Sequence, residues 1–268
     1  MEIRNPNKSH LPELLSLLER CFPGAWTAED VAGRIFYDEH YDPNHVWMAR
    51  EVGQTLGFLH TLQVGGCAWI KLLAVAPEAR RRGLGRDLLS RAEFRLSGEG
   101  AKEARIESTP PREFVAGIAP GSEAALFFDA CGYHAGAPQP VLTCPAKPGI
   151  LPPEPDRQAV AAFARAACGE QWAWAEEQLS WRPAHLAYRP EAGLCLAEPG
   201  ASLGPLWPVD GATPAALQTL VQEALAVASS VPTHRDRPLR VWQLPGGREL
   251  PGLDVQSEAL VPYYKKLT

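Results

Sequence analysis

The sequence lacks the features that mark membrane, secreted and nucleic-acid-binding proteins. No apolar run approaches membrane-spanning length, and the residues after Met1 contain no apolar core of a signal peptide. The formal net charge is −5, and neither half of the chain carries a basic domain or arm. We therefore expect a protein that binds neither a membrane nor nucleic acid, and whose charge mildly favours a cationic substrate over a polyanion.

Cysteine is also used sparingly, and its six occurrences are widely scattered. None forms a Cys-x-x-Cys pair or stands at zinc-ligand spacing from a histidine, so the sequence predicts no metal site. Several lie in apolar sequence, which is typical of buried free thiols in a reducing compartment. We therefore expect a cytoplasmic protein. The six are Cys21, Cys67, Cys131, Cys144, Cys168 and Cys195.

The chain does have the length and apolar content for one large domain or two of ordinary size. It has 268 residues, of which 46% are hydrophobic and 21% are charged. Prolines gather between residues 145 and 155, and such a segment cannot form a helix interior or a central strand. We therefore expect a first domain at residues 1–145, a stiff linker at 146–157 and a second domain at 158–268.

The most informative segment runs from the apolar residues 70–75 through a glycine-bearing turn into a helix. Pro77 ends the predicted strand, and the leucines that follow Gly83 repeat at helical spacing. Backbone N–H groups and the positive end of a helix dipole converge at such a turn, so it predicts an anion site. Four arginines, Arg80, Arg81, Arg82 and Arg86, add positive charge. The spacing matches neither the dinucleotide-binding pattern nor the Walker loop.

This segment resembles motif A of the GCN5-related N-acetyltransferase (GNAT) superfamily, which reads Val-x-Pro, Arg/Gln-x-x-Gly-x-Gly/Ala and then a leucine-rich helix. The matching residues are Val75, Pro77, Arg80, Gly83, Gly85, Leu88 and Leu89. The resemblance implies that backbone amides of the strand and the turn bind acetyl-CoA, with the pyrophosphate at the turn. The acetyl-CoA site would then comprise Leu73, Ala74, Val75, Arg80, Arg81, Arg82, Gly83, Leu84, Gly85 and Arg86.

The predicted order of elements over residues 1–145, β-α-α-β-β-β-α-β-α-β, is also that of the GNAT fold. We therefore expect an α/β protein with a mixed sheet. The second half shows the same order less one helix, which favours a tandem GNAT protein over an unrelated helical C-terminal domain. Its equivalent turn, Pro208 to Pro214, has one glycine and an aspartate, so we expect a degenerate copy without its own acetyl-CoA.

The second family signature is only partly present, at residues 121–133. Phe128 stands where relatives often carry the tyrosine that protonates the leaving thiolate, so the resemblance implies contact with the cofactor but no proton donor. Tyr133 retains a hydroxyl and is an alternative acid, although such a residue more often belongs to the core.

The general base is missing from its frequent place, where this chain has Lys71 and Leu72. The candidate bases are His60, Glu107 and the cluster Asp38-Glu39-His40. His60 has a suitable reference pKa, although a lone strand histidine is usually structural, and Glu107 would lie next to the cofactor cleft if its side chain faces that way. The loop residues Asp38, Glu39 and His40 are candidate contacts for the acceptor, because the corresponding loop lines the acceptor site in relatives.

These features together predict an enzyme that moves the acetyl group of acetyl-CoA to a primary amine by direct attack. The acceptor would be a small molecule or a peptide. Phe128 and Lys71 leave a second hypothesis open, a non-catalytic acyl-CoA-binding or regulatory protein. A scaffold with a dead site is a third, but it conflicts with the intact residues 80–85.

Overall fold

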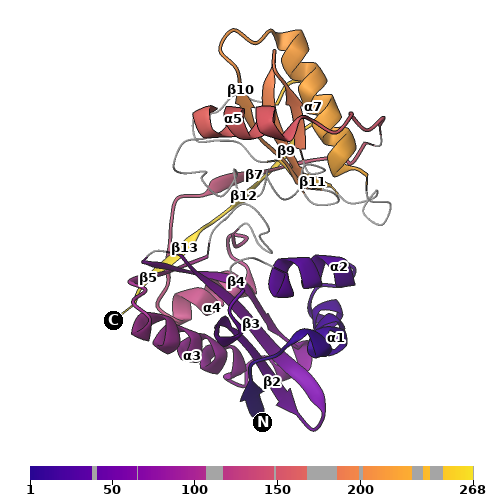
Figure 1. The fold of residues 1–268 in the computed structure, drawn as a ribbon. Helices are drawn as coiled ribbons and strands as arrows, with labels where there is room; N and C mark the ends of the chain where they lie inside the picture. The colour runs from indigo at the N-terminus through magenta and orange to yellow at the C-terminus, as the bar shows by residue number, and fades with distance from the viewer. Residues whose placement is uncertain are drawn as a thin grey trace. The chain divides into compact units, whose positions relative to one another are not determined.

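The chain forms two compact units in the computed structural model. The first unit comprises Met1–Gln139 and Ala259–Thr268, and the second comprises Pro140–Glu258. Figure 1 shows the helices and strands of both. The structure describes residues 1–37, 41–64, 66–106, 117–147, 149–167, 186–198, 202–230, 238–241 and 250–267.

The first unit is built on a seven-stranded mixed sheet, ordered β1-β2-β3-β4-β5-β13-β6. Neighbours from β1 to β4 are antiparallel, β4 and β5 are parallel, and β13 is antiparallel to both β5 and β6. This confirms the expected mixed α/β fold. The strands are β1 (Glu2–Arg4), β2 (Val46–Glu51), β3 (Gln54–Val64), β4 (Cys67–Val75), β5 (Glu103–Ile106), β13 (Tyr263–Lys266) and β6 (His134–Ala135).

Helices cover both faces of this sheet, with α1 and α2 on one side and α3 and α4 on the other (Figure 1). Leu14, Leu17 and Leu18 are at most 1% exposed, and their helical spacing gives α1 the apolar stripe that faces the sheet. Gly57 of β3 lets α3 approach closely, because a β-carbon there would lie 2.9 Å from a methyl carbon of Leu88. The helices are α1 (Leu11–Cys21), α2 (Ala28–Val31), a π-helix (Ala32–Phe36), α3 (Leu84–Gly98) and α4 (Glu123–Ala130), with short 3₁₀ turns at Lys8–His10, Pro43–His45 and Pro77–Ala79.

The second unit carries a six-stranded sheet, ordered β12-β7-β11-β10-β9-β8. β8 to β10 are antiparallel neighbours, and β10 runs parallel to β11 with α7 between them in sequence. The first unit connects β4, α3 and the parallel β5 in the same way. The elements are β7 (Gln139–Cys144), α5 (Arg157–Ala167), β8 (Leu186–Arg189), β9 (Gly193–Glu198), β10 (Ser202–Pro208), α7 (Pro214–Ala228), β11 (Leu239–Val241) and β12 (Gln256–Leu260).

The division into units differs from the one expected from the prolines. Residues 140–145, expected in the first domain, belong to the second unit, and residues 259–268 return to the first. The physical reason is strand pairing. Tyr263 lies opposite Ile106, so β13 completes the first sheet, while Leu142 of β7 lies opposite Val241 in the second sheet.

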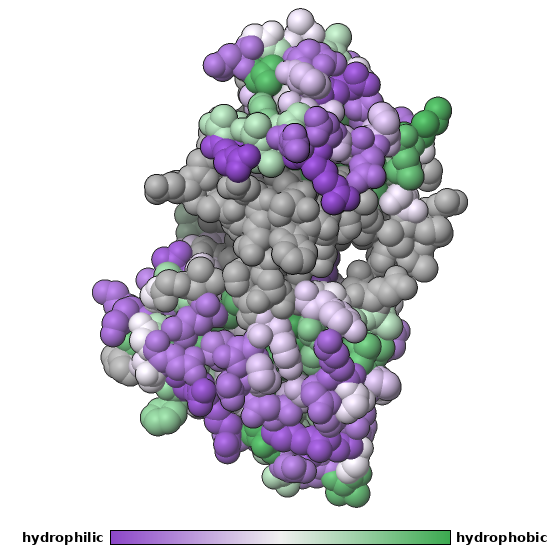
Figure 2. All heavy atoms as spheres, in the orientation of Figure 1, coloured by the Kyte–Doolittle hydropathy of each residue, from purple (hydrophilic) through white to green (hydrophobic). Residues whose placement is uncertain are grey.

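Two further features are missing from the described parts of the chain. None of the described helices combines the length and the apolar character that crossing a membrane requires. Within the same residues, no group of three or more His, Cys, Asp and Glu side chains is placed to hold a metal ion. Outside the grey residues, the visible face in Figure 2 is mostly hydrophilic, with scattered apolar side chains.

Candidate functional site

The arginine–glycine turn, residues 80–85, presents backbone N–H groups at the start of α3. Gly83 is the N-cap residue, its φ of 81° is left-handed, and no side chain caps the helix. The first hydrogen bond into the helix runs from the Asp87 N–H to the Gly83 carbonyl at 3.0 Å. The preceding N–H groups of Leu84, Gly85 and Arg86 therefore have no acceptor within the helix. Together with the helix dipole, these donors favour an anion.

The two glycines of the turn are required for different physical reasons. A β-carbon on Gly83 would meet no atom within 4 Å, so Gly83 combines a left-handed backbone with open space. A β-carbon on Gly85 would lie 3.3 Å from two ring carbons of Phe127 and 3.4 Å from Cγ2 of Val75. Only Gly83 borders open space, whereas Gly85 permits close packing of α3.

Two acidic residues lie against the arginines of the turn. Glu123, in the first turn of α4, is 3.6 Å from Nη1 of Arg80 and 3.4 Å from Nη2 of Arg81. Glu51, at the end of β2, is 3.2 Å from Nη2 of Arg82. The Arg81 side chain is 85% exposed, so these pairs are solvent-screened and weak. Sequence reasoning missed both carboxylates, because their contact with the turn depends on the packing of distant elements.

Backbone carbonyls also hold the side chains of Arg80 and Arg86. Nε of Arg80 donates to the Val75 carbonyl at 3.2 Å, which ties the turn to the end of β4. Nη2 of Arg86 donates to the Ala130 carbonyl at 3.3 Å, at the end of α4. The positive groups of the turn are therefore placed between β4, α3 and α4.

Strand β4 pairs with a described part of β5 over only a short stretch. Within the described residues, the two strands pair only from Cys67 to Trp69. On its other side β4 continues along β3 as far as Val75, with a bulge between Ile70 and Leu72. The edge of β4 on the β5 side therefore has no pairing partner after Trp69 among the described residues.

Strand alternation decides which amides face this edge. The Ala76 N–H donates to the Leu56 carbonyl of β3 at 2.9 Å, so every second residue back along β4 also bonds to β3. Ala74 is one of these residues, whereas Leu73 and Val75 point to the opposite side. Of the three amides expected to face the cofactor, Leu73 and Val75 are therefore available, and Ala74 is not.

The two aromatic residues singled out on α4 and after it belong to the core. Phe128 is 5% exposed and Tyr133 is 2% exposed, and their ring centroids are 5.3 Å apart. Burial and the carboxylate of Glu93 raise the pKa of Tyr133, so its phenol stays protonated. Tyr133 is thus placed as a packed core residue, and the aromatic residue of α4 that borders the turn is Phe127.

His60 lies in β3, opposite Leu72 at the bulge, and is 3% exposed. Burial, with smaller contributions from Lys71 and His45, lowers the pKa of His60 to about 3. An imidazole with that pKa is neutral at neutral pH and too weak to take a proton from an ammonium group. These surroundings disfavour His60 as the general base. Lys71 at the bulge is itself 5% exposed.

The remaining predicted site residues lie outside the described part of the chain. These are the candidate base Glu107 and the candidate acceptor contacts Asp38, Glu39 and His40.

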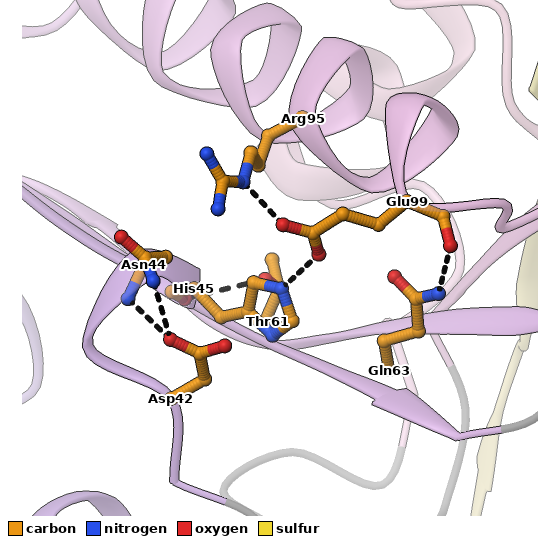
Figure 3. A network of polar contacts seen from close by, with 7 residues as sticks. All are labelled: Asp42, Asn44, His45, Thr61, Gln63, Arg95 and Glu99. Carbon is orange, nitrogen blue, oxygen red and sulfur yellow. Dashed lines mark hydrogen bonds and ion pairs between the residues drawn. The ribbon is translucent and has the colours of Figure 1, made fainter.

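A network of polar contacts fixes the far end of α3 (Figure 3). Nε2 of His45 is 2.6 Å from Oε2 of Glu99, which follows the last residue of the helix. Nε2 of Gln63 donates to the Glu99 carbonyl at 3.1 Å, and Arg95 pairs with the Glu99 carboxylate. The helix is 15 residues long, so at about 1.5 Å per residue this network is distant from the turn. Its role is to hold α3 on β2 and β3.

The start of α7 in the second unit differs from the start of α3 in its free backbone donors. The Thr213 side chain accepts a hydrogen bond from the Ala216 N–H at 3.2 Å and so caps α7. Pro214, at the first position of the helix, has no N–H group. α7 therefore presents fewer free donors than α3.

The donor set of the first unit fits a diphosphate group. It combines an uncapped helix N-terminus, a left-handed Gly83 facing open space, and arginine side chains that reach the same turn. Guanidinium groups and helix N-termini are the protein groups that bind phosphate most readily.

Comparison with known families gives a match in the same region. The model of the acetyltransferase (GNAT) family matches residues 11–115. This span contains β2 to β5, α3 and the arginine–glycine turn. No curated protein matches the sequence.

Solved structures share the fold over nearly the whole chain. A GCN5-related N-acetyltransferase from Sphaerobacter thermophilus is 17% identical with a TM-score of 0.67, and the match covers 99% of this chain and 95% of that one. A tandem GNAT protein from the clavulanic acid biosynthesis pathway is 16% identical with a TM-score of 0.66, covering 100% and 98%. A GCN5-related N-acetyltransferase from Kribbella flavida is 16% identical with a TM-score of 0.57, covering 99% and 72%. The fold of both units is therefore shared with these proteins.

Proposed function

Residues 11–115 form a domain of the GNAT family of acetyltransferases, and on that premise we propose that this enzyme transfers the acetyl group of acetyl-CoA to a primary amine. The acceptor is a small molecule or a peptide. The observation that carries the proposal is the uncapped start of α3 at Gly83, surrounded by arginines and open space.

In this proposal, different residues of the first unit bind different parts of acetyl-CoA. The N–H groups of Leu84, Gly85 and Arg86 and the nearby guanidinium groups hold the diphosphate of acetyl-CoA. The N–H groups of Leu73 and Val75 face the pantetheine arm and the thioester. Backbone donors dominate this site, so its affinity depends on turn conformation more than on individual side chains.

Transfer joins the acceptor nitrogen to the acetyl carbon and breaks the carbon–sulfur bond. The amine must lose a proton, and the departing sulfur must gain one or be stabilised as a thiolate. Phe128 has no proton to give, and Tyr133 is held in the core. We therefore assign protonation of the departing thiolate to solvent, and Glu107, outside the described residues, stays a candidate base.

We assign no second acetyl-CoA to the protein. The Thr213 cap and Pro214 support this, because they remove donors at the start of α7. The expected stoichiometry is one acetyl-CoA per chain, and a titration that finds two would contradict it.

The proposal is tested by following the release of free thiol from acetyl-CoA in the presence of an amine panel. The panel contains amino acids, polyamines, aminoglycosides and peptides with free N-termini or lysines. Thiol release that depends on one amine class and disappears in Gly83→Val supports the transferase. Tight binding without release for any amine favours instead the second candidate, an acyl-CoA-binding regulator, which the missing proton donor at Phe128 already suggests.

A further inference from the structure

We propose that Glu123 is a built-in competitor for the phosphate groups of the cofactor. In the free protein its carboxylate holds Arg80 and Arg81, and a bound diphosphate takes these two guanidinium groups from it. Glu123 thereby sets the affinity for acetyl-CoA and speeds the release of the CoA product. This inference rests on the proposed function, because it concerns the same turn.

Two separate contacts place the first turn of α4 against the start of α3. The apolar contact joins Phe127 to Gly85, where a β-carbon would lie 3.3 Å from two ring carbons. The polar contact joins Glu123, one helical turn before Phe127, to Arg80 and Arg81 at 3.6 and 3.4 Å. The packing of α4 on α3 therefore places Glu123 beside the turn independently of the ion pairs.

The position of Glu123 makes it a rival of any anion at the turn. A diphosphate at the N–H groups of Leu84 and Gly85 would also attract the two guanidinium groups that Glu123 now contacts. It also brings further negative charge within a few ångströms of the carboxylate, which is repulsive at low ionic strength. The pairs are exposed, with 70% of the Glu123 side chain accessible, so the guanidinium groups exchange partners at little cost.

The same carboxylate favours the fold of α4. Glu123 is the first residue of the helix, and Ser122 caps it by accepting from the Ala125 N–H at 3.2 Å. A negative charge at this position interacts favourably with the helix dipole. Removing the charge should therefore lower stability slightly while it tightens anion binding. These opposite signs separate the proposed role from a general loss of structure.

The decisive variant is Glu123→Gln, compared with wild type by calorimetric titration with acetyl-CoA and by thermal unfolding. At low ionic strength we expect acetyl-CoA to bind about three- to tenfold more tightly to Glu123→Gln. In 1 M salt, where the screening length is about 3 Å, the difference should fall below about twofold. Unchanged or weaker binding at low ionic strength would overturn the proposal.

Glu154→Gln is the matched control. Glu154 also forms an exposed pair with an arginine, 3.1 Å from Nη2 of Arg157, but it lies in the second unit. The Glu154→Gln substitution removes the same formal charge as Glu123→Gln, so it reports the effect of net charge alone. The affinity for acetyl-CoA should stay within about twofold of wild type at both salt concentrations. An equal gain in both variants would mean that Glu123 has no specific role.

A double-mutant cycle with Arg81→Gln locates the effect. If Glu123 acts by competing for Arg81, the gain from Glu123→Gln should shrink in the Arg81→Gln background, and a full, additive gain would contradict the exchange. Inorganic pyrophosphate serves as a second ligand throughout. Wild-type protein that binds neither ligand overturns both the proposed function and this inference. Wild-type protein that binds acetyl-CoA, with Glu123→Gln unchanged, overturns only the role of Glu123.

Discussion

Gly85 and Phe127 lie so close that α3 and α4 have no room for a side chain between them. A β-carbon on Gly85 would come within 3.3 Å of Cε2 and Cζ of Phe127. Gly85 thus sets how near the start of α3 comes to α4 and to Val75 of β4. Since the arginine–glycine turn lies at this junction, the packing of one glycine fixes the position of the free N–H groups at the start of α3.

We predict that Gly85→Ala lowers the free energy of unfolding by about 1 kcal/mol, because a few tenths of an ångström of overlap must be relieved. The shifted turn should also bind acetyl-CoA more weakly. Thermal unfolding and titration check both effects. Gly98→Ala is the control in the same helix, because a β-carbon there meets no atom within 4 Å. It should be neutral or stabilising by up to about 1 kcal/mol. Equal effects of both variants would refute the packing argument.

Gly83 should respond differently, because its backbone is left-handed and its surroundings are open. Gly83→Asn keeps a residue that tolerates this conformation, so stability should fall by less than about 1 kcal/mol. Its side chain nevertheless enters the open space, so acetyl-CoA binding should be lost. Gly83→Val should lose both binding and about 1 to 2 kcal/mol of stability. If a folded Gly83→Asn variant keeps its affinity for acetyl-CoA, the diphosphate does not bind at this turn.

The pair of His45 and Glu99 predicts an acid-sensitive anchor for α3. Burial alone would raise the pKa of Glu99, but hydrogen bonds from His45 and Arg95 outweigh it and lower the pKa. A carboxylate whose pKa is lower in the folded state stabilises the fold above its unfolded pKa, and this contribution is lost as the pH falls through the folded value. The free energy of unfolding should therefore decrease below about pH 4.5.

Urea unfolding of wild type and Glu99→Gln at pH 7 and pH 3.5 checks this prediction. The substitution should destabilise the protein at pH 7 and less at pH 3.5, which lies below the ordinary pKa of a glutamate, so that part of the contribution of Glu99 is lost. Glu154→Gln serves as the exposed control and should show no such difference. The same loss at both pH values would show that the charge on Glu99 does not contribute.

His60 should leave the pH dependence of the reaction unchanged. Its pKa is lowered to about 3, chiefly by burial, so it does not titrate between pH 5 and pH 9. In rate profiles over that range, His60→Gln should therefore show the same apparent pKa values as wild type. The absolute rate is free to change, because His60 packs beside the bulge of β4. If one of the apparent pKa values of the wild-type rate profile disappears in His60→Gln, His60 acts as the general base after all.

The turn and its helix could be predicted from the sequence because their signals are local. Gly83, the arginines and the leucines of α3 lie within one short segment, and backbone donors there need no distant partner. The sequence could not predict that β7 belongs to the second sheet and β13 to the first. These assignments depend on strand pairing between residues far apart in the chain, such as Tyr263 with Ile106. The carboxylate of Glu123 and the ring of Phe127 also reach the turn only through packing. The sequence analysis assigned the cofactor contact to Phe128, the residue after Phe127. On a helix, successive side chains point in different directions, and Phe128 points into the core.

The central claim is that the start of α3 binds the diphosphate of acetyl-CoA. The most direct test is a calorimetric titration of wild type and Gly83→Asn with acetyl-CoA, with thermal unfolding recorded for both. The account predicts one site per chain in wild type, and no binding to a Gly83→Asn variant whose stability is nearly that of wild type. Absence of binding to wild type, or equal binding to both proteins, would contradict it.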